Sequence, residues 1–358
     1  MSSRKPTAAE SVGRDAISRV LVASHPLEVL MVVDRLVKGY GLESASLENE
    51  AGCGLRAFLI LLGSLVLFAL AAVAVAWFVL TQRVEGQYFE SVGARLHYTD
   101  EGQGEVVLLL HGFAVNSDLN WRLTGIVGAL SPRFRVVALD LRGHGLSDKP
   151  HGERAYGLAL IADVINLLDH LRIERAHLVG YSLGGFVALK SAALYPERIR
   201  STTLIGAGWE APDGGLFLSA IPRLQETLVR GGSIGPLSEF LEGAREPPSL
   251  LHAWSVHLMT GYFNDPHALA ALIGSLPELT VPESELRMIP GPVLAIVGER
   301  DPFRLSAAAL CGRVQDYRMM VVEGADHVRL AWEATTTESL LQFLIGPERI
   351  ADGCAGGP

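Results

Sequence analysis

The chain has 358 residues, of which 49% are hydrophobic, and its 30 basic and 39 acidic residues give a formal net charge of −9. This length allows one large domain with appendages. The mild acidity, without a patch or stripe of Lys and Arg, argues against a nucleic-acid-binding protein. The three cysteines, Cys53, Cys311 and Cys354, lie far apart and show neither a disulfide framework nor a metal-ligand spacing. Three unpaired thiols are therefore expected.

A transmembrane helix is predicted over residues 57–80. This segment contains no charged residue, Arg56 and Arg83 bracket it, and Trp77 suits an interfacial position. As a helix it reaches across a hydrocarbon core of roughly 30 Å. Globular core helices are seldom apolar on every face for this length, and the run is too long for the apolar part of a signal peptide. We expect a single-pass membrane protein whose residues 1–56 form a loosely ordered tail.

Strands and helices alternate from residue 86 to residue 346. Apolar runs predict strands at Tyr88–Val92, Ala94–Tyr98, Val106–Leu110, Arg135–Leu139, Ala176–Val179, Thr202–Ile205, Val293–Val297 and Met319–Val322. Helical patterns follow several of them, at Leu160–Leu171, Phe186–Leu194 and Thr337–Leu344. Repeated β-α-β units indicate an α/β fold with a mostly parallel sheet and flanking helices. In such folds ligands bind at the edge formed by the C-terminal ends of the strands. Residues 347–358 are expected to form a C-terminal tail.

Residues 209–288 interrupt this alternation. They contain helical pieces with apolar residues such as Trp254 and Tyr262, broken by Gly and Pro pairs, and no strand-like run of comparable strength. An insertion of this size at the strand ends is typical of a cap over a site. Its apolar residues need a surface to cover, so we expect a helical cap.

A sharp turn around Ser182 is predicted between a strand and a helix. Gly180 and Gly184 flank the serine in a Gly-x-Ser-x-Gly pattern. Because glycine has no Cβ, the backbone can bend tightly there and neighbouring elements can approach. The pattern leaves the serine at the tip of the turn with its hydroxyl exposed over the N-terminus of the helix. Such a serine is a candidate nucleophile.

Four other predicted strands end in motifs that carry polar chemistry. These motifs are His111-Gly112-Phe113, the segment 140–147, Gly298-Glu299-Arg300-Asp301 and Gly324-Ala325-Asp326-His327. Together with the serine turn, they resemble the α/β-hydrolase superfamily from about Tyr88 to Leu344, in the family order Ser, Asp, His. The resemblance does not cover the chain before about Glu85.

The resemblance implies a role for each matching residue. Ser182 would be the nucleophile, His327 the general base and Asp301 the carboxylate that orients His327. The backbone N–H groups of Phe113 and Leu183 would form the oxyanion hole.

Other polar residues at the strand ends leave alternatives or have structural interpretations. Glu299 and Asp326 remain alternatives to Asp301. His111 and His144 are expected to shape loops through hydrogen bonds. Asp140 and Arg142 (both in the segment 140–147) are expected to form a structural pair that ties strand ends together.

The expected function is a membrane-anchored serine hydrolase, esterase- or lipase-like, that cleaves carboxylic esters through an acyl-serine intermediate. Its partners would be a small-molecule ester or lipid and the membrane through residues 57–80, with no cofactor, metal or nucleic acid. A serine at position 182 argues against haloalkane dehalogenase and epoxide hydrolase chemistry, where related folds use a carboxylate. Carbon–carbon bond hydrolysis, peptidase or acyltransferase activity with the same triad stays open, as does a non-catalytic ligand-binding receptor.

Overall fold

The computed structural model describes residues 62–68, 71, 84–212, 214–230, 234–241, 264–346 and 354. The chain divides into two compact units, Met1–Thr81 and Gln82–Pro358. In the first unit, residues 62–68 and 71 are helical and exposed. The rest of the predicted span 57–80, the tail 1–56 and nearly all of the tail 347–358 lie outside the described residues. Among the residues that are described, none belongs to a helix long and apolar enough to cross a membrane.

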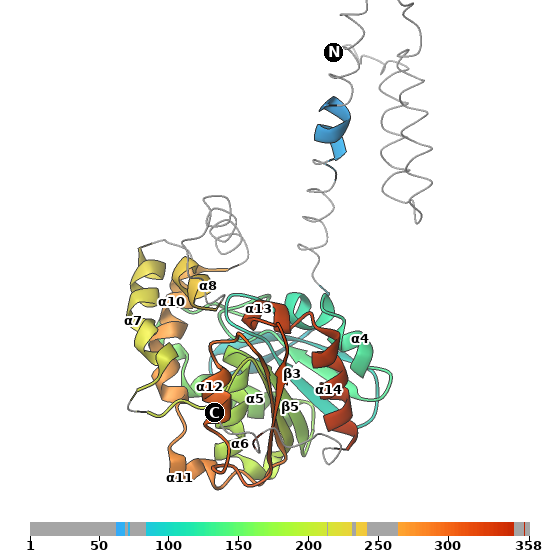
Figure 1. Ribbon diagram of the computed structural model, residues 1–358, viewed down its shortest axis with the longest axis vertical. Coiled ribbons are helices and arrows are strands. Elements are labelled where there is room, and N and C mark those ends of the chain that lie inside the picture. The colour runs from blue at the N-terminus through green and yellow to red at the C-terminus, as the bar shows by residue number, and fades with distance from the viewer. Residues whose placement is uncertain are drawn as a thin grey trace, which may run out of the picture. The chain divides into compact units, whose positions relative to one another are not determined.

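The second unit is built on an eight-stranded sheet with the order β1-β2-β4-β3-β5-β6-β7-β8 (Figure 1). The strands are β1 (Gln87–Ser91), β2 (Ala94–Glu101), β3 (Val106–Leu110), β4 (Arg135–Leu139), β5 (Ala176–Tyr181), β6 (Ile199–Ile205), β7 (Val293–Gly298) and β8 (Tyr317–Val322). The β1–β2 and β2–β4 pairs are antiparallel, and every other pair in the sheet is parallel. All eight predicted strands are present, with differences of a few residues at their ends.

Helices cover both faces of this sheet, as expected. One face packs against α5 (Leu158–His170) and α6 (Leu183–Leu194), and the other against α4 (Ile126–Leu130) and α14 (Ala334–Ile345). Every residue of β3 is buried, because successive side chains point into the two different apolar cores. The parallel strands therefore hold their C-terminal ends at one edge.

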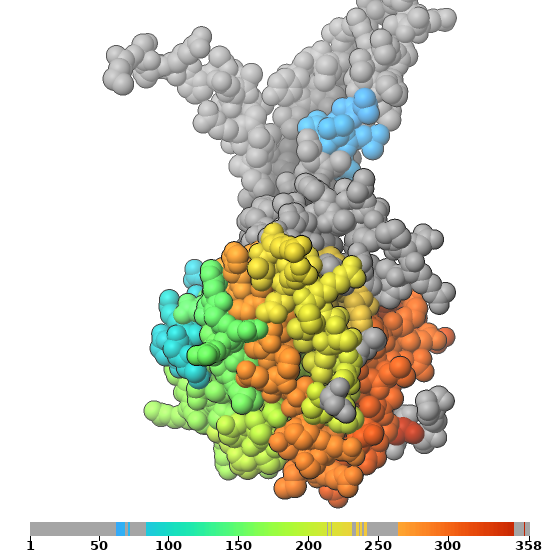
Figure 2. Space-filling view, turned by 90° about the vertical axis from the view of Figure 1, so that its left-hand side faces the viewer, coloured from blue at the N-terminus to red at the C-terminus, as the bar shows by residue number. Residues whose placement is uncertain are grey.

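The interval predicted as a cap is helical where it is described. It contains α7 (Leu216–Val229), α8 (Gly235–Leu241), α10 (Pro266–Ser275), the 3-10 turn η4 (Leu276–Leu279) and α11 (Glu283–Leu286). Helices α7 (yellow) and α10 (orange) pack against each other and share one face of the molecule (Figure 2). The Asp265 side chain caps α10 by accepting the N–H groups of His267 and Ala268. Residues 242–263, which include Trp254 and Tyr262, lie outside the described residues.

A disulfide bond joins Cys311 to Cys354, with 5.8 Å between their Cα atoms. The prediction of three unpaired thiols was therefore wrong for these two residues. They are 43 residues apart in the sequence, and only the fold brings them within the Cα distance that a disulfide requires. Cys53 lies outside the described residues.

Candidate active site

Ser182 stands at the sharp turn between β5 and α6, as the sequence predicted. Its backbone has φ +53° and ψ −114°, a conformation that residues other than glycine rarely adopt. A Cβ on Gly180 would lie 2.1 Å from the carbonyl oxygen of Gly184, and one on Gly184 would lie 2.0 Å from that of Leu110. The two glycines are thus required for the close approach of three backbone segments that holds Ser182 in place.

His327 and Asp301 form a buried pair beyond the ends of the neighbouring strands β8 and β7. The Nδ1 atom of His327 lies 3.1 Å from both carboxylate oxygens of Asp301. With its proton on Nδ1, the imidazole donates to this carboxylate and leaves Nε2 as an acceptor. Nε2 is buried and has no hydrogen-bond partner within the described part of the chain. No hydrogen bond joins it to Ser182, a bond that is often long before substrate binds.

The two alternative carboxylates are used elsewhere. Glu299 accepts the backbone N–H of Gly324 at 2.9 Å. Asp326 caps the short helix α13 (His327–Leu330) by accepting the backbone N–H of Arg329 at 2.8 Å. Of the three acidic residues considered from the sequence, Asp301 is the one bonded to the His327 ring.

Gly206, which follows β6, leaves room for this pair. A Cβ there would lie 2.9 Å from Cε1 of His327 and 3.2 Å from a carboxylate oxygen of Asp301, and its φ is +59°. Sequence reasoning missed this residue, although a glycine directly after a predicted strand was a visible signal.

The N–H groups proposed for an oxyanion hole are both open. The residues on either side of Phe113 are engaged: Gly112 N–H donates to Asn120 Oδ1 at 2.9 Å, and Ala114 N–H donates to His144 Nε2 at 3.0 Å. Between them, the Phe113 N–H donates to no other group among the described residues. Leu183 is the first residue of α6, where the helix offers its N–H no acceptor.

This loop also lies beside the nucleophile. A Cβ on Gly112 would lie 3.5 Å from the Cβ of Ser182. The loop that contains Gly112 and the start of α6 at Leu183 therefore both lie next to Ser182.

His111 and His144 shape the surrounding loops, as expected. His111 accepts the Leu141 N–H at Nε2 and donates from Nδ1 to the Gly112 carbonyl, at 3.0 and 2.7 Å. Burial lowers the pKa of His111, and it lowers the pKa of His144 to about 3. Both rings are neutral acceptors near neutral pH, which their hydrogen bonds require.

Asp140 and Arg142 do not pair with each other, contrary to expectation. The Asp140 carboxylate accepts hydrogen bonds from Ser117 N–H at 2.9 Å and Leu146 N–H at 3.0 Å. Arg142 instead donates from Nε to Asp163 of α5 at 2.6 Å. The partner of Arg142 lies on a helix that the strand-end motifs do not include, so the sequence could not indicate it.

A cluster of phenylalanine rings connects His327 to the cap. The ring centroid of Phe303 lies 5.4 Å from that of His327. Phe186 of α6 and Phe217 of α7 lie 5.6 and 5.5 Å from Phe303, and Phe240 of α8 lies 5.8 Å from it. The cap helices thus contact the site through these rings, which sequence reasoning did not single out.

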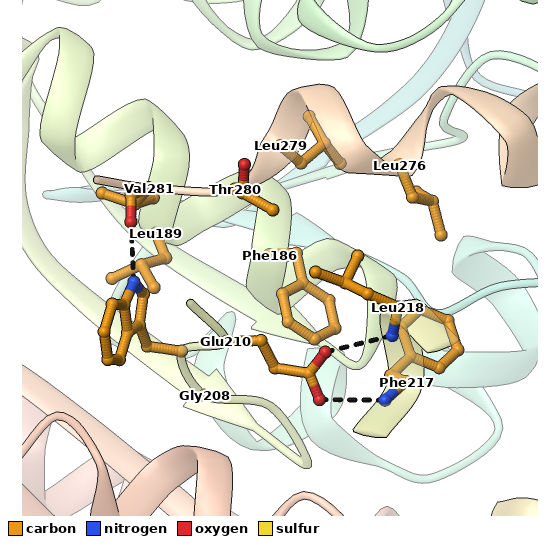
Figure 3. A pocket seen from close by; sticks show the side chains of 11 residues that line it. Phe186, Leu189, Gly208, Glu210, Phe217, Leu218, Leu276, Leu279, Thr280 and Val281 are labelled. Carbon is orange, nitrogen blue, oxygen red and sulfur yellow. Dashed lines mark hydrogen bonds between the residues drawn. The ribbon is translucent and has the colours of Figure 1, made fainter. Parts of the chain in front are cut away.

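A narrow pocket opens beyond Phe186 and Phe217 (Figure 3). About 410 Å³ of space lies in and in front of it, open solvent included, and its lining residues are Phe186, Leu189, Gly208, Trp209, Glu210, Phe217, Leu218, Leu276, Leu279, Thr280 and Val281. The Glu210 carboxylate accepts the N–H groups of Phe217 and Leu218, each at 3.1 Å, and so caps the start of α7 (Figure 3). The rest of the lining is mainly apolar. Phe186 lies four residues after Ser182, or about one helical turn.

Comparison with known proteins agrees with this architecture. Residues 105–227 match the family model of the alpha/beta hydrolase fold. An uncharacterized protein of Mycobacterium tuberculosis is 37% identical over 140 residues, which cover 38% of this chain and 40% of that protein. Haloalkane dehalogenase 2 of the same organism is 35% identical over 144 residues, which cover 40% of this chain and 49% of the dehalogenase. The chain spans half or less of the length of these two relatives.

Solved structures are similar over most of the chain. A membrane phospholipase A, described as a bacterial virulence factor, is 25% identical with a TM-score of 0.59, covering 81% of this chain and 99% of that chain. The enol-lactonase of Burkholderia xenovorans is 23% identical with a TM-score of 0.58, covering 72% of this chain and all of the lactonase chain. By its sheet and these likenesses, the chain has the α/β-hydrolase fold, and residues 105–227 match the family model of that fold.

Proposed function

We propose that the protein is a serine hydrolase that cleaves carboxylic esters through an acyl-Ser182 intermediate. The observation that carries the proposal is the buried Asp301–His327 pair, whose imidazole has an open Nε2 atom. This pair stands at the same edge of the sheet as the strained turn that presents Ser182. A serine hydroxyl needs such a base, because it is a weak nucleophile while it keeps its proton.

The reaction follows from these positions. His327 takes the hydroxyl proton as Ser182 Oγ attacks the ester carbonyl carbon, and Asp301 stabilises the imidazolium. The N–H groups of Phe113 and Leu183 stabilise the oxyanion, each contributing on the order of 3 kcal/mol in the transition state. The leaving alcohol takes the proton from His327 as the carbon–oxygen bond breaks. Water, deprotonated by His327, then attacks the acyl carbon. The bond from this carbon to Ser182 Oγ breaks, Oγ takes the proton back from His327, and the acid leaves.

The pocket supports a substrate with an apolar acyl group. It starts about one helical turn from Ser182 and its walls are mainly apolar, so an acyl chain loses contact with water when it enters. The buried Glu210 carboxylate at its side repels a chain that ends in an anion. The similarity to a membrane phospholipase A over 81% of this chain also supports a lipid ester.

The proposal includes a membrane anchor at residues 57–80. Its support is the uncharged apolar run of the sequence. The Cys311–Cys354 disulfide favours a hydrolase domain on the oxidising side of the membrane, because disulfides persist in extracytoplasmic compartments and are rare in the cytosol.

The position of Ser182 separates this proposal from the chemistry named for one relative. Haloalkane dehalogenase 2 is 35% identical over 144 residues, yet the turn in this chain carries a serine. A serine forms an acyl-enzyme from an ester, whereas displacement of a halide in this fold relies on a carboxylate nucleophile.

Turnover by the full chain in detergent tests the proposal. We expect p-nitrophenyl esters to be hydrolysed and Ser182→Ala to lower kcat by on the order of 10⁴-fold or more. Ser131→Ala, which changes a serine before β4, is the matched control and should keep full activity. Hydrolysis that persists in Ser182→Ala would rule out the acyl-serine mechanism.

A further inference from the structure

Tyr181, the residue before the nucleophile, contacts the loop that carries His327. Its hydroxyl donates a hydrogen bond to the main-chain carbonyl of His327. The two ring centroids are 5.3 Å apart. Burial raises the pKa of Tyr181 well above its ordinary value, so the hydroxyl keeps its proton and remains a donor near neutral pH.

The same ring also packs against the proposed oxyanion loop. A Cβ on Gly112 would lie 2.9 Å from Cδ1 of Tyr181, so the ring occupies the space next to a residue that has no side chain. The fully buried Trp121 also packs edge-on against this ring, at 6.4 Å between centroids. These neighbours leave the Tyr181 ring little freedom to turn.

His327 needs this support because its own element is short. Helix α13 has four residues and follows the turn that ends at Asp326. The Asp301 carboxylate orients the imidazole at Nδ1, but it does not hold the main chain of His327. Tyr181 does so from the last position of β5, which is flanked in the sheet by β3 and β6.

We propose that Tyr181 is a positioning residue for the general base. Its hydroxyl ties the main chain of His327 to the strand that carries Ser182, and so sets the separation of Ser182 Oγ and His327 Nε2 during proton transfer. The hydroxyl of Tyr181 donates to the main chain of His327 and not to its imidazole. The inference rests on the proposed function, since positioning matters only if His327 takes the proton of Ser182.

The test is Tyr181→Phe, which keeps the ring and removes only the donor. Tyr317→Phe is the matched control, because Tyr317 is similarly buried and its hydroxyl also donates to a main-chain carbonyl, that of Ala307 at 2.7 Å. Tyr317 begins β8, at the end of the strand away from the site. Rates are expressed per active site, counted by the end point of fluorophosphonate labelling, so that misfolded protein does not enter the comparison.

We expect Tyr181→Phe to lower kcat for a p-nitrophenyl ester and the rate of fluorophosphonate labelling together, by about tenfold or more. KM should stay within about twofold, because the acyl pocket is unchanged. Tyr317→Phe should lower neither rate. In a His327→Ala background, Tyr181→Phe should cause no further loss, because the residue through which it acts is gone.

Three results would overturn the inference, and they are distinguishable. If Ser182→Ala abolishes labelling while Tyr181→Phe matches wild type per active site, the proposed function stands and the positioning role fails. A loss of the same size in the wild-type and His327→Ala backgrounds would also refute the role, since it would not act through His327. If Ser182→Ala is still labelled, the proposed function fails, and the inference fails with it.

Discussion

The edge of the sheet supplies every side chain of the proposed chemistry, whereas the cap supplies much of the wall of the pocket. Ser182, Asp301 and His327 each follow a parallel strand, and the strand register sets their relative positions. The cap contacts Phe303, beside His327, through the rings of Phe217 and Phe240. Its helices α7 and α10 are capped by Glu210 and Asp265. In the proposed function, residues at the sheet edge carry out the reaction, while cap residues line the space that an acyl chain would enter.

The largest effect is expected from a substitution at the sheet edge. Asp301→Asn leaves the shape of the site intact but removes the charge that stabilises the His327 imidazolium, so kcat should fall by on the order of 10⁴-fold with little change in KM. Asp326→Asn, which alters the carboxylate next to His327 in sequence, should retain activity within about tenfold, because that carboxylate caps α13. Steady-state kinetics on both variants check the assignment, and equal losses would contradict it.

Gly206→Ala should have the next largest effect. The new Cβ would lie 2.9 Å from the His327 ring, and displacing a catalytic group by about 1 Å costs on the order of 10²-fold in rate. Gly312→Ala is the control: its φ is +74°, but a Cβ there meets nothing within 4 Å. Both variants carry the backbone strain, so a comparable loss of kcat in Gly312→Ala would show that strain rather than the contact with His327 is responsible.

The strands and the turn at Ser182 could be predicted from the sequence, because each depends on residues that are close together in the chain. β3 and β4 have the predicted bounds, since a strand buried on both faces is a continuous apolar run between turns. The turn at Ser182 is equally local, because Gly180 and Gly184 lie two residues away on either side.

Long-range contacts were not predictable in the same way. Arg142 pairs with Asp163 of α5, and Cys311 pairs with Cys354; neither partner lies in a motif shared with the first residue. The walls of the pocket likewise combine α6 with η4 and α7, which only the fold brings together. Periodicity indicates an apolar face but not the face on which it packs.

A substitution in the cap tests whether the pocket selects the length of the acyl chain. Leu218→Trp adds volume to the wall of the pocket, and each methylene excluded from an apolar pocket costs at least about tenfold in specificity. We expect kcat/KM for a long-chain p-nitrophenyl ester to fall by about tenfold relative to the acetate ester. Val229→Trp, at an exposed position on the same helix, should not change this ratio. An unchanged ratio in Leu218→Trp would show that the acyl chain does not occupy this pocket.

The smallest expected effect is on the pH dependence of stability, through His144 in the loop beside Phe113. His144 binds a proton near pH 6.5 in the unfolded chain but only near pH 3 in the folded one. Between these values the unfolded state binds more protons, so the free energy of unfolding falls as the pH is lowered, by at most about 1.4 kcal/mol per pH unit. Above pH 6.5 this contribution is complete.

Variants isolate this contribution from that of the other titrating groups. His144→Gln should flatten the decrease in Tm between pH 6 and pH 4, whereas His267→Gln, at an exposed position, should not. Identical pH dependence in wild type and His144→Gln would show that the buried ring does not carry the effect.

The site of covalent modification is the clearest test of the acyl-serine mechanism. The full chain is reacted with a fluorophosphonate at neutral pH, digested, and mapped by mass spectrometry. We expect a single adduct on the peptide that contains Ser182, formed much more slowly in His327→Ala. An adduct on another residue, or labelling of Ser182 at the same rate without His327, would contradict it.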